Sequence, residues 1–281
     1  MKKGFLTIII CLVLSVPVCA ESDDTDTLTL PVVMYHHITK IPSRCNDYVV
    51  SLEEFERDID YLSSNGWQTV GIDELIAWSR GELELPEKAF MLTFDDGFES
   101  TLAYAEPVLR SHGYTGVLAV IGSVCEKFSE CGEHDAELSN LSWEDTAGMA
   151  RRGTFNIICH TWDMHTLSRR PGCSKRRGES SEQYKAALRQ DLGRFIDECE
   201  KNSVALKPAI AYPYGSFCSE TLEIIEEMGF AAAFTCDEAV NHLQREPSSL
   251  MRIARFNRAH GSSSEKFFQK WEEAVDKECS V

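Results

Sequence analysis

The chain has 281 residues, which is long enough for one large α/β barrel or for two small domains. Asp and Glu outnumber Lys and Arg by 45 to 28, a net charge of −17. So acidic a surface argues against nucleic acid and anionic polymers as partners, and it fits a neutral substrate or a small cation.

The first twenty residues have the features of a secretory signal peptide. Lys2 and Lys3 precede an uncharged run from Phe5 to Val18, and the segment ends in the small residue Ala20. The run is too short for a comfortable membrane span, so we expect cleavage after Ala20 and no stable span afterwards. The mature protein is then secreted or periplasmic. Because the leader holds two lysines and no acid, 26 basic and 45 acidic residues remain, a net charge of −19.

Nine of the 11 cysteines follow this leader. Export makes at least one disulfide an expectation, and the odd number leaves at least one thiol free or paired between chains. Cys125 and Cys131 flank a polar stretch that is predicted to be a loop and could bridge locally. Cys159 and Cys236 lie at the ends of apolar runs and are expected to be buried as small hydrophobes. No CxxC pair is present, so a zinc site built on cysteines is not expected.

The rest of the chain alternates between predicted strands and helices. Residues 21–30 are acidic and rich in threonine, which predicts a flexible lead-in to a single domain over residues 31–281. Strands are predicted at residues 31–35, 68–70, 89–94, 115–121, 155–159, 209–212, 231–235 and 250–254. Helices or long loops separate them, which indicates a parallel sheet. We therefore expect the α/β class, with an irregular (β/α) barrel of about seven to eight parallel strands.

The strand predicted at 89–94 ends at two adjacent carboxylates, Asp95 and Asp96, before the chain turns at Gly97. Because side chains alternate across a strand, Asp95 is expected to point into the interior of the barrel. Adjacent buried carboxylates repel each other and lose hydration, so they require a cation nearby. Taken alone, this stretch is explained more simply as a strand that ends in an Asp-Asp-Gly turn; the rest of the chain reverses that preference.

Two more polar clusters follow predicted strands, where the active sites of α/β barrels form. His160 and His165 follow the strand at 155–159, and Tyr212-Pro-Tyr-Gly215 ends the strand at 209–212. The histidines are five residues apart, so they cannot share a helix face, but they can converge from a loop. Two imidazoles and one carboxylate form a facial set that leaves metal positions open for water and substrate. Ordinary loop histidines are the alternative for this pair alone.

Together these motifs resemble a known family. In their order and intervals, Thr93-Phe-Asp-Asp-Gly97, His160-Thr161-x-x-x-His165 and Tyr212-Pro-Tyr-Gly215 are similar to the motifs of polysaccharide deacetylases of the NodB homology type, carbohydrate esterase family four. The opening Pro31-Val-Val-Met-Tyr-His-His-Ile38 resembles the branch that trims exported poly-N-acetylglucosamine. The resemblance covers about residues 31 to 255. It implies an N-acetylated polysaccharide as substrate and a divalent metal, usually zinc, as cofactor.

The resemblance also implies individual roles. Three residues would hold the metal: Asp96, His160 and His165. Asp95 would be the catalytic base, and Thr161 would brace the histidine loop. The backbone N–H of Tyr214 would help to bind the oxyanion, while Pro213 and Gly215 would shape that turn. A bound divalent cation would also explain how two adjacent carboxylates can both be ionised.

One departure from the family pattern concerns the partner of the base. The third motif usually begins with an arginine that holds the catalytic base, and that place falls near Tyr212 here. On the strand predicted at 250–254, Arg252 shares a face with Leu250 and Ala254. We therefore expect Arg252 to be buried, either paired with Asp95 in the site or in a structural ion pair unrelated to catalysis.

The second departure concerns the general acid. The usual Leu-x-His is absent, and Arg258-Ala-His260 matches it poorly. His36 and His37, which follow the first predicted strand, are candidates for this role and for substrate contact; a metal-bound water or simple loop polarity are the alternatives.

The leading hypothesis is a secreted, metal-dependent N-deacetylase of a β-linked N-acetylglucosamine polymer. An O-acetyl esterase or a small-amide amidase on the same scaffold is one alternative. An inactive carbohydrate-binding relative is another, although binding alone does not require a base beside a metal.

Overall fold

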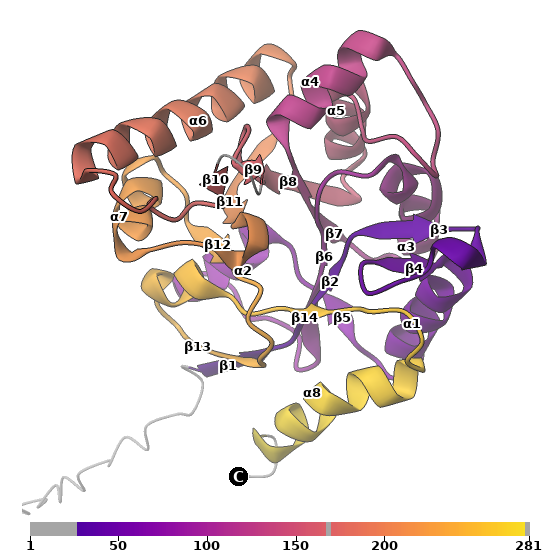
Figure 1. Ribbon diagram of the computed structural model, residues 1–281. Helices are drawn as coiled ribbons and strands as arrows, with labels where there is room; N and C mark the ends of the chain where they lie inside the picture. Colours follow the sequence, from indigo (N-terminus) through magenta and orange to yellow (C-terminus); the bar gives the residue numbers. More distant parts are fainter. Residues whose placement is uncertain (1–26, 167–169, 279–281) are drawn as a thin grey trace, which may run out of the picture.

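The computed structural model describes residues 27–166 and 170–278, so the predicted signal peptide lies outside the described residues. Its centre is a sheet of parallel strands in the order β12-β11-β8-β7-β6-β2-β14, and β5 pairs with the start of β6 (Figure 1). In that order, followed by β5, the strands span Ala232–Phe234, Leu206–Ala211, Phe155–Cys159, Gly116–Val120, Ala89–Phe94, Val32–Tyr35, Phe256–Asn257 and Gln68–Thr69.

One short segment near the C-terminal end closes this sheet into an irregular barrel. Ile253 forms a parallel bridge with Phe234 at the end of β12. A few residues later, β14 pairs with Val33 and Met34 of β2, at the other end of the strand order. The same stretch of chain is therefore bonded to both edges of the sheet. The predicted irregular barrel of parallel strands is confirmed.

The strand predicted at 250–254 is wrong. Pro247–Arg252 form a 3-10 helix, η5, which begins with a proline, and extended backbone resumes only at Ile253. Proline fixes φ near the helical value and suits the first turn of a helix, so it moves the extended backbone towards the C-terminus. The period assumed for this stretch consequently has the wrong register.

Helices surround the barrel (Figure 1). In chain order they are α1 Leu52–Ser64, α2 Ile72–Ser79, α3 Glu106–His112, α4 Gly122–Cys131, α5 Trp143–Arg152, α6 Ser181–Lys201, α7 Ser219–Glu227 and α8 Ser264–Glu278, with a π-helical turn, η3, at Thr101–Ala105. The capping box predicted at Ser51 and Glu54 is present at the start of α1. It satisfies backbone N–H groups that the first turn leaves unpaired.

The alternation along β6 divides the apolar side chains into two cores. Phe90, Leu92 and Phe94 pack under the surrounding helices. Met91 belongs to the other core, inside the barrel, together with Val32 and other small or branched residues. The next residue on this inward face after Thr93 is Asp95, so the strand period carries a carboxylate into the interior end of the barrel.

Three short strand pairs lie outside the barrel sheet: β1 Thr27–Leu30 with β13 Asn241–Gln244, β3 His37–Thr39 with β4 Val49–Ser51, and β9 His165–Thr166 with β10 Arg170–Pro171. The first of these corrects the predicted flexible lead-in, because residues 27–30 form an antiparallel strand whose Leu30 is fully buried. Residues 21–26 lie outside the described part of the chain.

The predicted local disulfide is also wrong. Cys125 and Cys131 lie on one helix, α4, where six residues correspond to a rise of about 9 Å. A disulfide requires Cα atoms closer than about 7 Å. Eight cysteines lie in the described residues, and all eight are free: Cys45, Cys125, Cys131, Cys159, Cys173, Cys199, Cys218 and Cys236.

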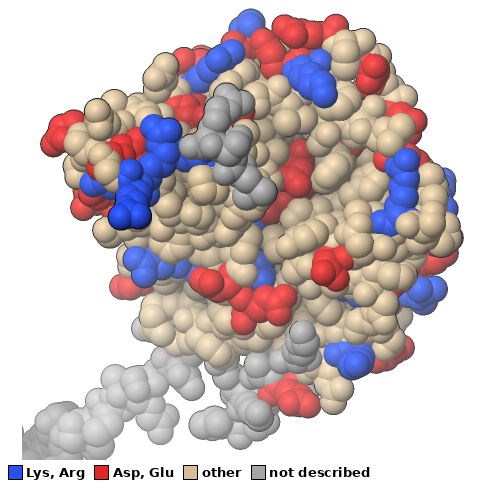
Figure 2. Space-filling view, viewed as in Figure 1, with Lys and Arg blue, Asp and Glu red and all other residues tan. Residues whose placement is uncertain are grey.

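The surface mixes both signs of charge. Figure 2 shows acidic and basic side chains interspersed over one face, with acidic side chains in a hollow near its centre. No helix in residues 27–166 or 170–278 is long and apolar enough to span a membrane.

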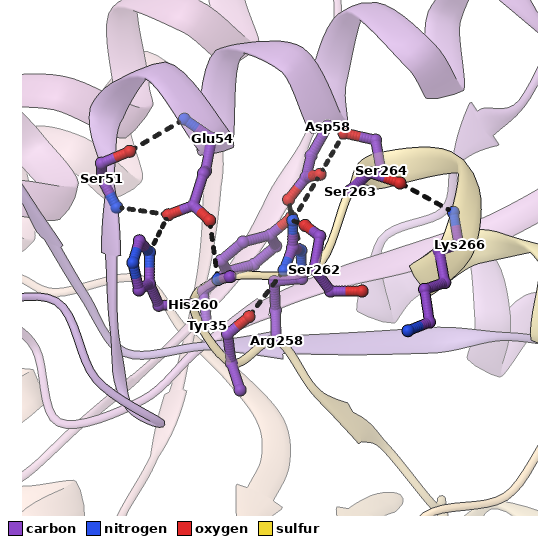
Figure 3. Close-up of polar contacts among 12 residues, drawn as sticks. Tyr35, Ser51, Glu54, Asp58, Arg258, His260, Ser262, Ser263, Ser264 and Lys266 are labelled. Atoms are coloured by element: carbon purple, nitrogen blue, oxygen red, sulfur yellow. Dashed lines mark hydrogen bonds and ion pairs between the residues drawn. The ribbon is translucent and has the colours of Figure 1, made fainter.

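A buried ion pair fastens the loop before α8 to α1 (Figure 3). The side chains of Asp58 and Arg258 are 0% and 1% exposed, and the guanidinium Nε and a terminal N–H donate to the two carboxylate oxygens at 2.7 and 3.1 Å. Tyr35 and Ser264 donate to the same carboxylate at 2.8 and 2.6 Å. These hydrogen bonds compensate for the loss of hydration, which would otherwise exclude both charges from the interior.

We predict that Arg258→Met lowers the free energy of unfolding by about 3–5 kcal/mol, because it leaves the carboxylate of Asp58 buried without its cation. Urea unfolding followed by circular dichroism measures this change. The control is Arg57→Met, which removes an exposed charge from α1, the helix that carries Asp58. We expect it to change the free energy of unfolding by no more than about 0.5 kcal/mol. Equal stabilities of the two variants would contradict the role given to the ion pair.

Candidate active site

A cavity of about 750 Å³ opens where β2, β6 and β8 end, at the carboxyl edge of the barrel. Its walls combine carboxylates, imidazoles and exposed aromatic rings from segments far apart in the sequence. The polar and aromatic residues that line it include His36, His37, Asp47, Tyr48, Asp95, Asp96, His160, His165, Tyr214, Glu238 and Asn257. The carboxyl edge of parallel strands is where α/β proteins form their sites, and all three predicted motifs contribute to this one.

Asp95 lies at the bottom of the cavity and is 2% exposed. A bidentate ion pair holds it: the two terminal nitrogens of Arg255 donate to Oδ1 and Oδ2 at 2.7 and 2.8 Å. Burial alone would raise the pKa of the Asp95 carboxyl, but Arg255 and the neighbouring His160 hold it well below its usual value. Asp95 is therefore an ionised carboxylate with a fixed orientation.

Arg255 is itself fully buried, and hydrogen bonds fix the orientation of its guanidinium. Its Nε donates to the carbonyl oxygen of Thr235 at 2.8 Å, and one terminal nitrogen also reaches Thr93 Oγ1 at 3.3 Å. Burial opposes the charge of this guanidinium, yet Asp95 keeps its pKa above the usual value. The arginine that the third motif lacks is thus supplied by the segment that closes the barrel.

The prediction that Arg252 is buried and partners Asp95 is wrong. Arg252 is exposed at the end of η5, and its guanidinium lies 5.5 Å from the ring centre of Phe217. Apolar residues flank Arg255 just as they flank Arg252, so the local sequence alone could not show which of the two is buried.

The three predicted metal ligands converge beside Asp95. The Nε2 atoms of His160 and His165 lie 3.5 and 3.3 Å from Asp96 Oδ1, and a set of ligand atoms from the three residues lies within 4.8 Å. His160 Nδ1 lies 2.8 Å from the carbonyl oxygen of Ala211, so Nδ1 donates its proton there and Nε2 is the ring nitrogen that faces Asp96. A second bond of this kind commonly orients histidine ligands of metals.

These residues fit a divalent metal ion. Asp96 Oδ1 is buried without a hydrogen-bond donor, although it faces both imidazoles. Burial would raise the pKa of Asp96, but the histidines, His160 foremost, hold it below the usual value. Burial lowers the pKa of His165, which favours the neutral ring that ligation needs. Two imidazoles and a carboxylate are a donor set that suits zinc and other first-row metals.

The backbone adopts strained conformations at the same place. Among the described residues, four non-glycine residues have positive φ, and three of them belong to the motifs of this site: Asp96, Thr161 and Tyr214 at 68°, 68° and 58°. Left-handed backbone costs such residues free energy, so it persists where surrounding contacts fix it. Thr161 makes one such contact, because its Oγ1 accepts from the backbone N–H of Met164 at 3.2 Å inside the histidine loop.

The other predicted residues separate into cavity wall and support. His36, His37 and Tyr214 line the cavity, whereas Pro213 is buried in the turn η4, Pro213–Gly215, behind it. His37 Nδ1 lies 2.9 Å from Ser100 Oγ and is thereby occupied. His36 Nδ1 is buried and has no partner, and burial lowers the pKa of its ring.

Comparison with known proteins identifies the family. The family model described as polysaccharide deacetylase matches residues 82–233, more than half of the chain. The chain belongs to the polysaccharide deacetylase family. The poly-β-1,6-N-acetyl-D-glucosamine N-deacetylase of Escherichia coli K12 is 27% identical over 230 residues, which cover 75% of this chain and 34% of that protein. The enzyme of the same name from Staphylococcus aureus MRSA252 is 26% identical over 194 residues, 68% of this chain and 62% of that one.

The chain therefore spans about a third of the length of the E. coli relative. Among solved structures, IcaB from Ammonifex degensii superposes with a TM-score of 0.67 at 25% identity, covering 88% of this chain and 96% of that one. A de-N-acetylase from Aggregatibacter actinomycetemcomitans gives a TM-score of 0.70 at 19% identity, over 88% and 99% of the two chains. The second likeness concerns the fold alone.

Sequence reasoning missed a residue that anchors the histidine loop of this family member. Asp191 of α6 accepts the backbone N–H groups of Trp162 and Asp163 at 2.7 and 2.9 Å. From the other side, the N–H groups of Gly122 and Ser123 donate to the carbonyl oxygens of residues 161 and 162 at 3.0 and 2.9 Å. The loop is thus held between α6 and the start of α4, which fixes the separation of its two histidines.

One further expectation is wrong. Cys236 is exposed and lines the cavity, so it is not a buried small hydrophobe, although Cys159 is buried as expected. Arg258-Ala-His260, which matches the Leu-x-His pattern poorly, supplies no histidine to the cavity: Arg258 pairs with Asp58, and His260 pairs with Glu54.

We predict that Asp191→Ala weakens metal binding by about ten- to a hundredfold, the scale of losing a group that orients metal ligands. Competition with a chromogenic chelator measures the dissociation constant. Asp191→Asn keeps one acceptor oxygen and should lie between the two. Asp197→Ala removes an exposed acid from the same helix and should bind metal like the unmodified chain. Unchanged affinity in Asp191→Ala, with the fold intact, would mean that the α4 contacts suffice.

Proposed function

We propose that the protein is a metal-dependent N-deacetylase that removes acetyl groups from a β-linked N-acetylglucosamine polysaccharide. One observation carries the proposal: a carboxylate held by a buried arginine lies directly beside a three-residue set of metal ligands in an open cavity. Family membership and two relatives named poly-β-1,6-N-acetyl-D-glucosamine N-deacetylase support the substrate class.

Asp96, His160 and His165 would hold the ion, for which we propose zinc. When bound there, a divalent ion supplies Lewis acidity, which polarises an acyl carbonyl and lowers the pKa of a bound water towards 7. The chain fixes the ligand geometry through the carbonyl oxygen of Ala211 and the anchored histidine loop.

Asp95 is the proposed general base. It is adjacent in sequence to Asp96, ionised, and held in one orientation, so it can accept the proton of the water that attacks the acetamide carbon. Arg255 keeps this carboxylate in place and compensates for its burial. General-base catalysis of this kind contributes roughly a hundred- to ten-thousandfold to turnover.

The leaving amine needs a proton from the cavity wall, and His36 is the better of the two predicted candidates. The ring of His37 is already bonded to Ser100, whereas His36 Nδ1 has no partner. Burial lowers the pKa of His36, while the charges of Asp95 and Asp96 oppose that change and favour the protonated ring. The backbone N–H of Tyr214, in its left-handed turn on the cavity wall, is proposed to bind the developing oxyanion.

The composition of the cavity fits an uncharged sugar. Among the described residues, those that line it include four carboxylates and no Lys or Arg, so an anionic polymer would meet repulsion there. We also propose that the protein acts outside the cytoplasm, on the basis of its predicted N-terminal leader.

We predict acetate release from poly-N-acetylglucosamine in the presence of zinc, measured by an enzyme-coupled acetate assay. Chitin oligomers, peptidoglycan and acetylxylan complete the panel. Preference for acetylxylan would move the assignment to an O-acetyl esterase. Sugar binding without acetate release from any substrate would indicate a binding protein.

Three variants with greatly lowered activity serve as controls for this assay. Asp95→Asn and His36→Gln should retain zinc and lose turnover by about a hundredfold or more, the scale of lost proton transfer. Asp96→Ala should lose the metal itself. Full activity in Asp95→Asn would place the base elsewhere.

A comparison of two arginine variants gives a separate prediction. Arg255→Met should reduce turnover by about a hundredfold with zinc content unchanged, because Asp95 loses its orientation. Arg252→Met removes an exposed charge three residues away and should leave turnover within a few fold of the unmodified value. Similar turnover in both variants, measured with folded, zinc-loaded protein, would refute the positioning role of Arg255.

A further inference from the structure

A second group of metal-type donors lies outside the catalytic cavity, on the outer side of the loops that form its mouth. The thiol of Cys45, the carboxylate of Glu54 and the imidazole of His260 offer ligand atoms that all lie within 4.8 Å of one another. Cys45 ends the short helix η2, Pro42–Arg44; Glu54 lies in the first turn of α1; and His260 lies in the loop after β14. CxxC spacing could not reveal this group, because its members are up to 215 residues apart.

The carboxylate of Glu54 is already oriented (Figure 3). The backbone N–H groups of Gly261 and Ser51 donate to Oε1 and Oε2 at 2.9 and 3.1 Å, and His260 Nδ1 lies 2.6 Å from Oε2. Burial would raise the pKa of Glu54, but these hydrogen bonds lower it to about 2, so the carboxylate is ionised at neutral pH.

The three donors also differ in exposure in a way that permits entry of an ion. Glu54 is buried, Cys45 is half-buried and His260 is exposed. Thiolate, imidazole and carboxylate are the three ligand types that zinc takes in proteins, usually as a tetrahedral set. The backbone N–H groups that hold Glu54 would act as the outer partners that orient a metal ligand.

We propose that Cys45, Glu54 and His260 form a second metal site, with a preference for zinc or another thiophilic divalent ion and with water as the fourth ligand. Binding releases the thiol proton of Cys45. The proton of His260 moves from Nδ1 to Nε2, so that Nδ1 presents its lone pair to the ion. Two ligands of a tetrahedral zinc ion are about 3.3 Å apart, so the imidazole and carboxylate, now 2.6 Å apart, need to separate by about 0.7 Å.

Occupancy of this site connects three segments around the mouth of the catalytic cavity. Asp47 and Tyr48 follow Cys45 and line the cavity, as does Ala259, which precedes His260. The backbone N–H of His260 donates to the carbonyl oxygen of Asn46 at 3.2 Å, so the two loops are already in contact. An ion at the second site would therefore stabilise the loops at the cavity mouth. This structural role does not depend on the proposed catalytic activity.

Cobalt(II) titration tests the site independently of activity, because a thiolate ligand gives a sulfur-to-cobalt charge-transfer band in the near ultraviolet. The catalytic ligand set contains no sulfur. The expected result is a charge-transfer band in the unmodified chain and in Asp96→Ala, and its loss in Cys45→Ser and His260→Gln. Two zinc equivalents should bind to the unmodified chain and one to Cys45→Ser or to Asp96→Ala.

Two cysteine variants serve as matched controls. Cys131→Ser removes another exposed thiol, and Cys236→Ser removes the thiol that lines the catalytic cavity; both should keep the band. The proposal is overturned if the unmodified chain shows no band, if the band survives Cys45→Ser, or if Cys236→Ser abolishes it. In the first case Glu54 and His260 form a hydrogen-bonded contact only, and the catalytic proposal is unaffected.

Discussion

The buried ion pair between Arg255 and Asp95 is the constraint on which the barrel and its site both depend. Taking a guanidinium and a carboxylate out of water costs several kcal/mol per ion unless geometry and further hydrogen bonds compensate. Compensation here comes from two N–H···O bonds within the pair and from the carbonyl oxygen of Thr235. Asp95 follows β6, Thr235 follows β12, and Arg255 lies in the segment that closes the sheet. The same guanidinium therefore connects the ends of β6 and β12 and keeps Asp95 ionised.

The candidate metal site formed by Asp96, His160 and His165 is likewise held in place by hydrogen bonds from neighbouring elements. Its candidate ligands follow β6 and β8, two strands that β7 separates in the sheet. The carbonyl oxygen of Ala211 holds His160, and the carboxylate of Asp191 and the backbone at the start of α4 hold the histidine loop. The backbone is strained at Asp96 and at Thr161. Each of these residues follows another polar residue of the site, and the strain is the energetic cost of turning both towards the cavity. The rigid surroundings keep the donors together before any ion arrives.

Local patterns were sufficient to predict most strands of the barrel and the residues of the candidate site. Strand alternation placed Asp95 inside, and the spacing of His160 and His165 predicted their convergence, because both signals act over a few residues. Arg252 was assigned wrongly because the argument required the register of a strand, and Pro247 shifts that register by starting a 3-10 helix. A change of three residues exchanged an exposed arginine for a buried one.

Contacts between distant segments left no such signal. Asp191 is one acid among several on α6, and only the fold shows that it faces the histidine loop, 28 residues before it in the chain. The strand at 27–30 was predicted to be flexible from its composition, and nothing nearby in the sequence indicates its partner, residues 241–244, which lies more than 200 residues later. The pattern of residues in one short stretch cannot indicate hydrogen bonds to a strand that lies far away in the sequence.

The position of Arg255 also determines when the site becomes complete during folding. It is separated from Asp95 by 160 residues, so the pair can form only after the strands between them have been synthesised. Until residues 253–258 are in place, the gap between β12 and β2 stays open, and Asp95 lacks the cation that compensates for its burial. A chain that ends before Arg255 would still contain Asp96, His160 and His165, but it would lack the guanidinium that orients Asp95. Closure of the barrel and orientation of this carboxylate therefore depend on the same late-synthesised segment.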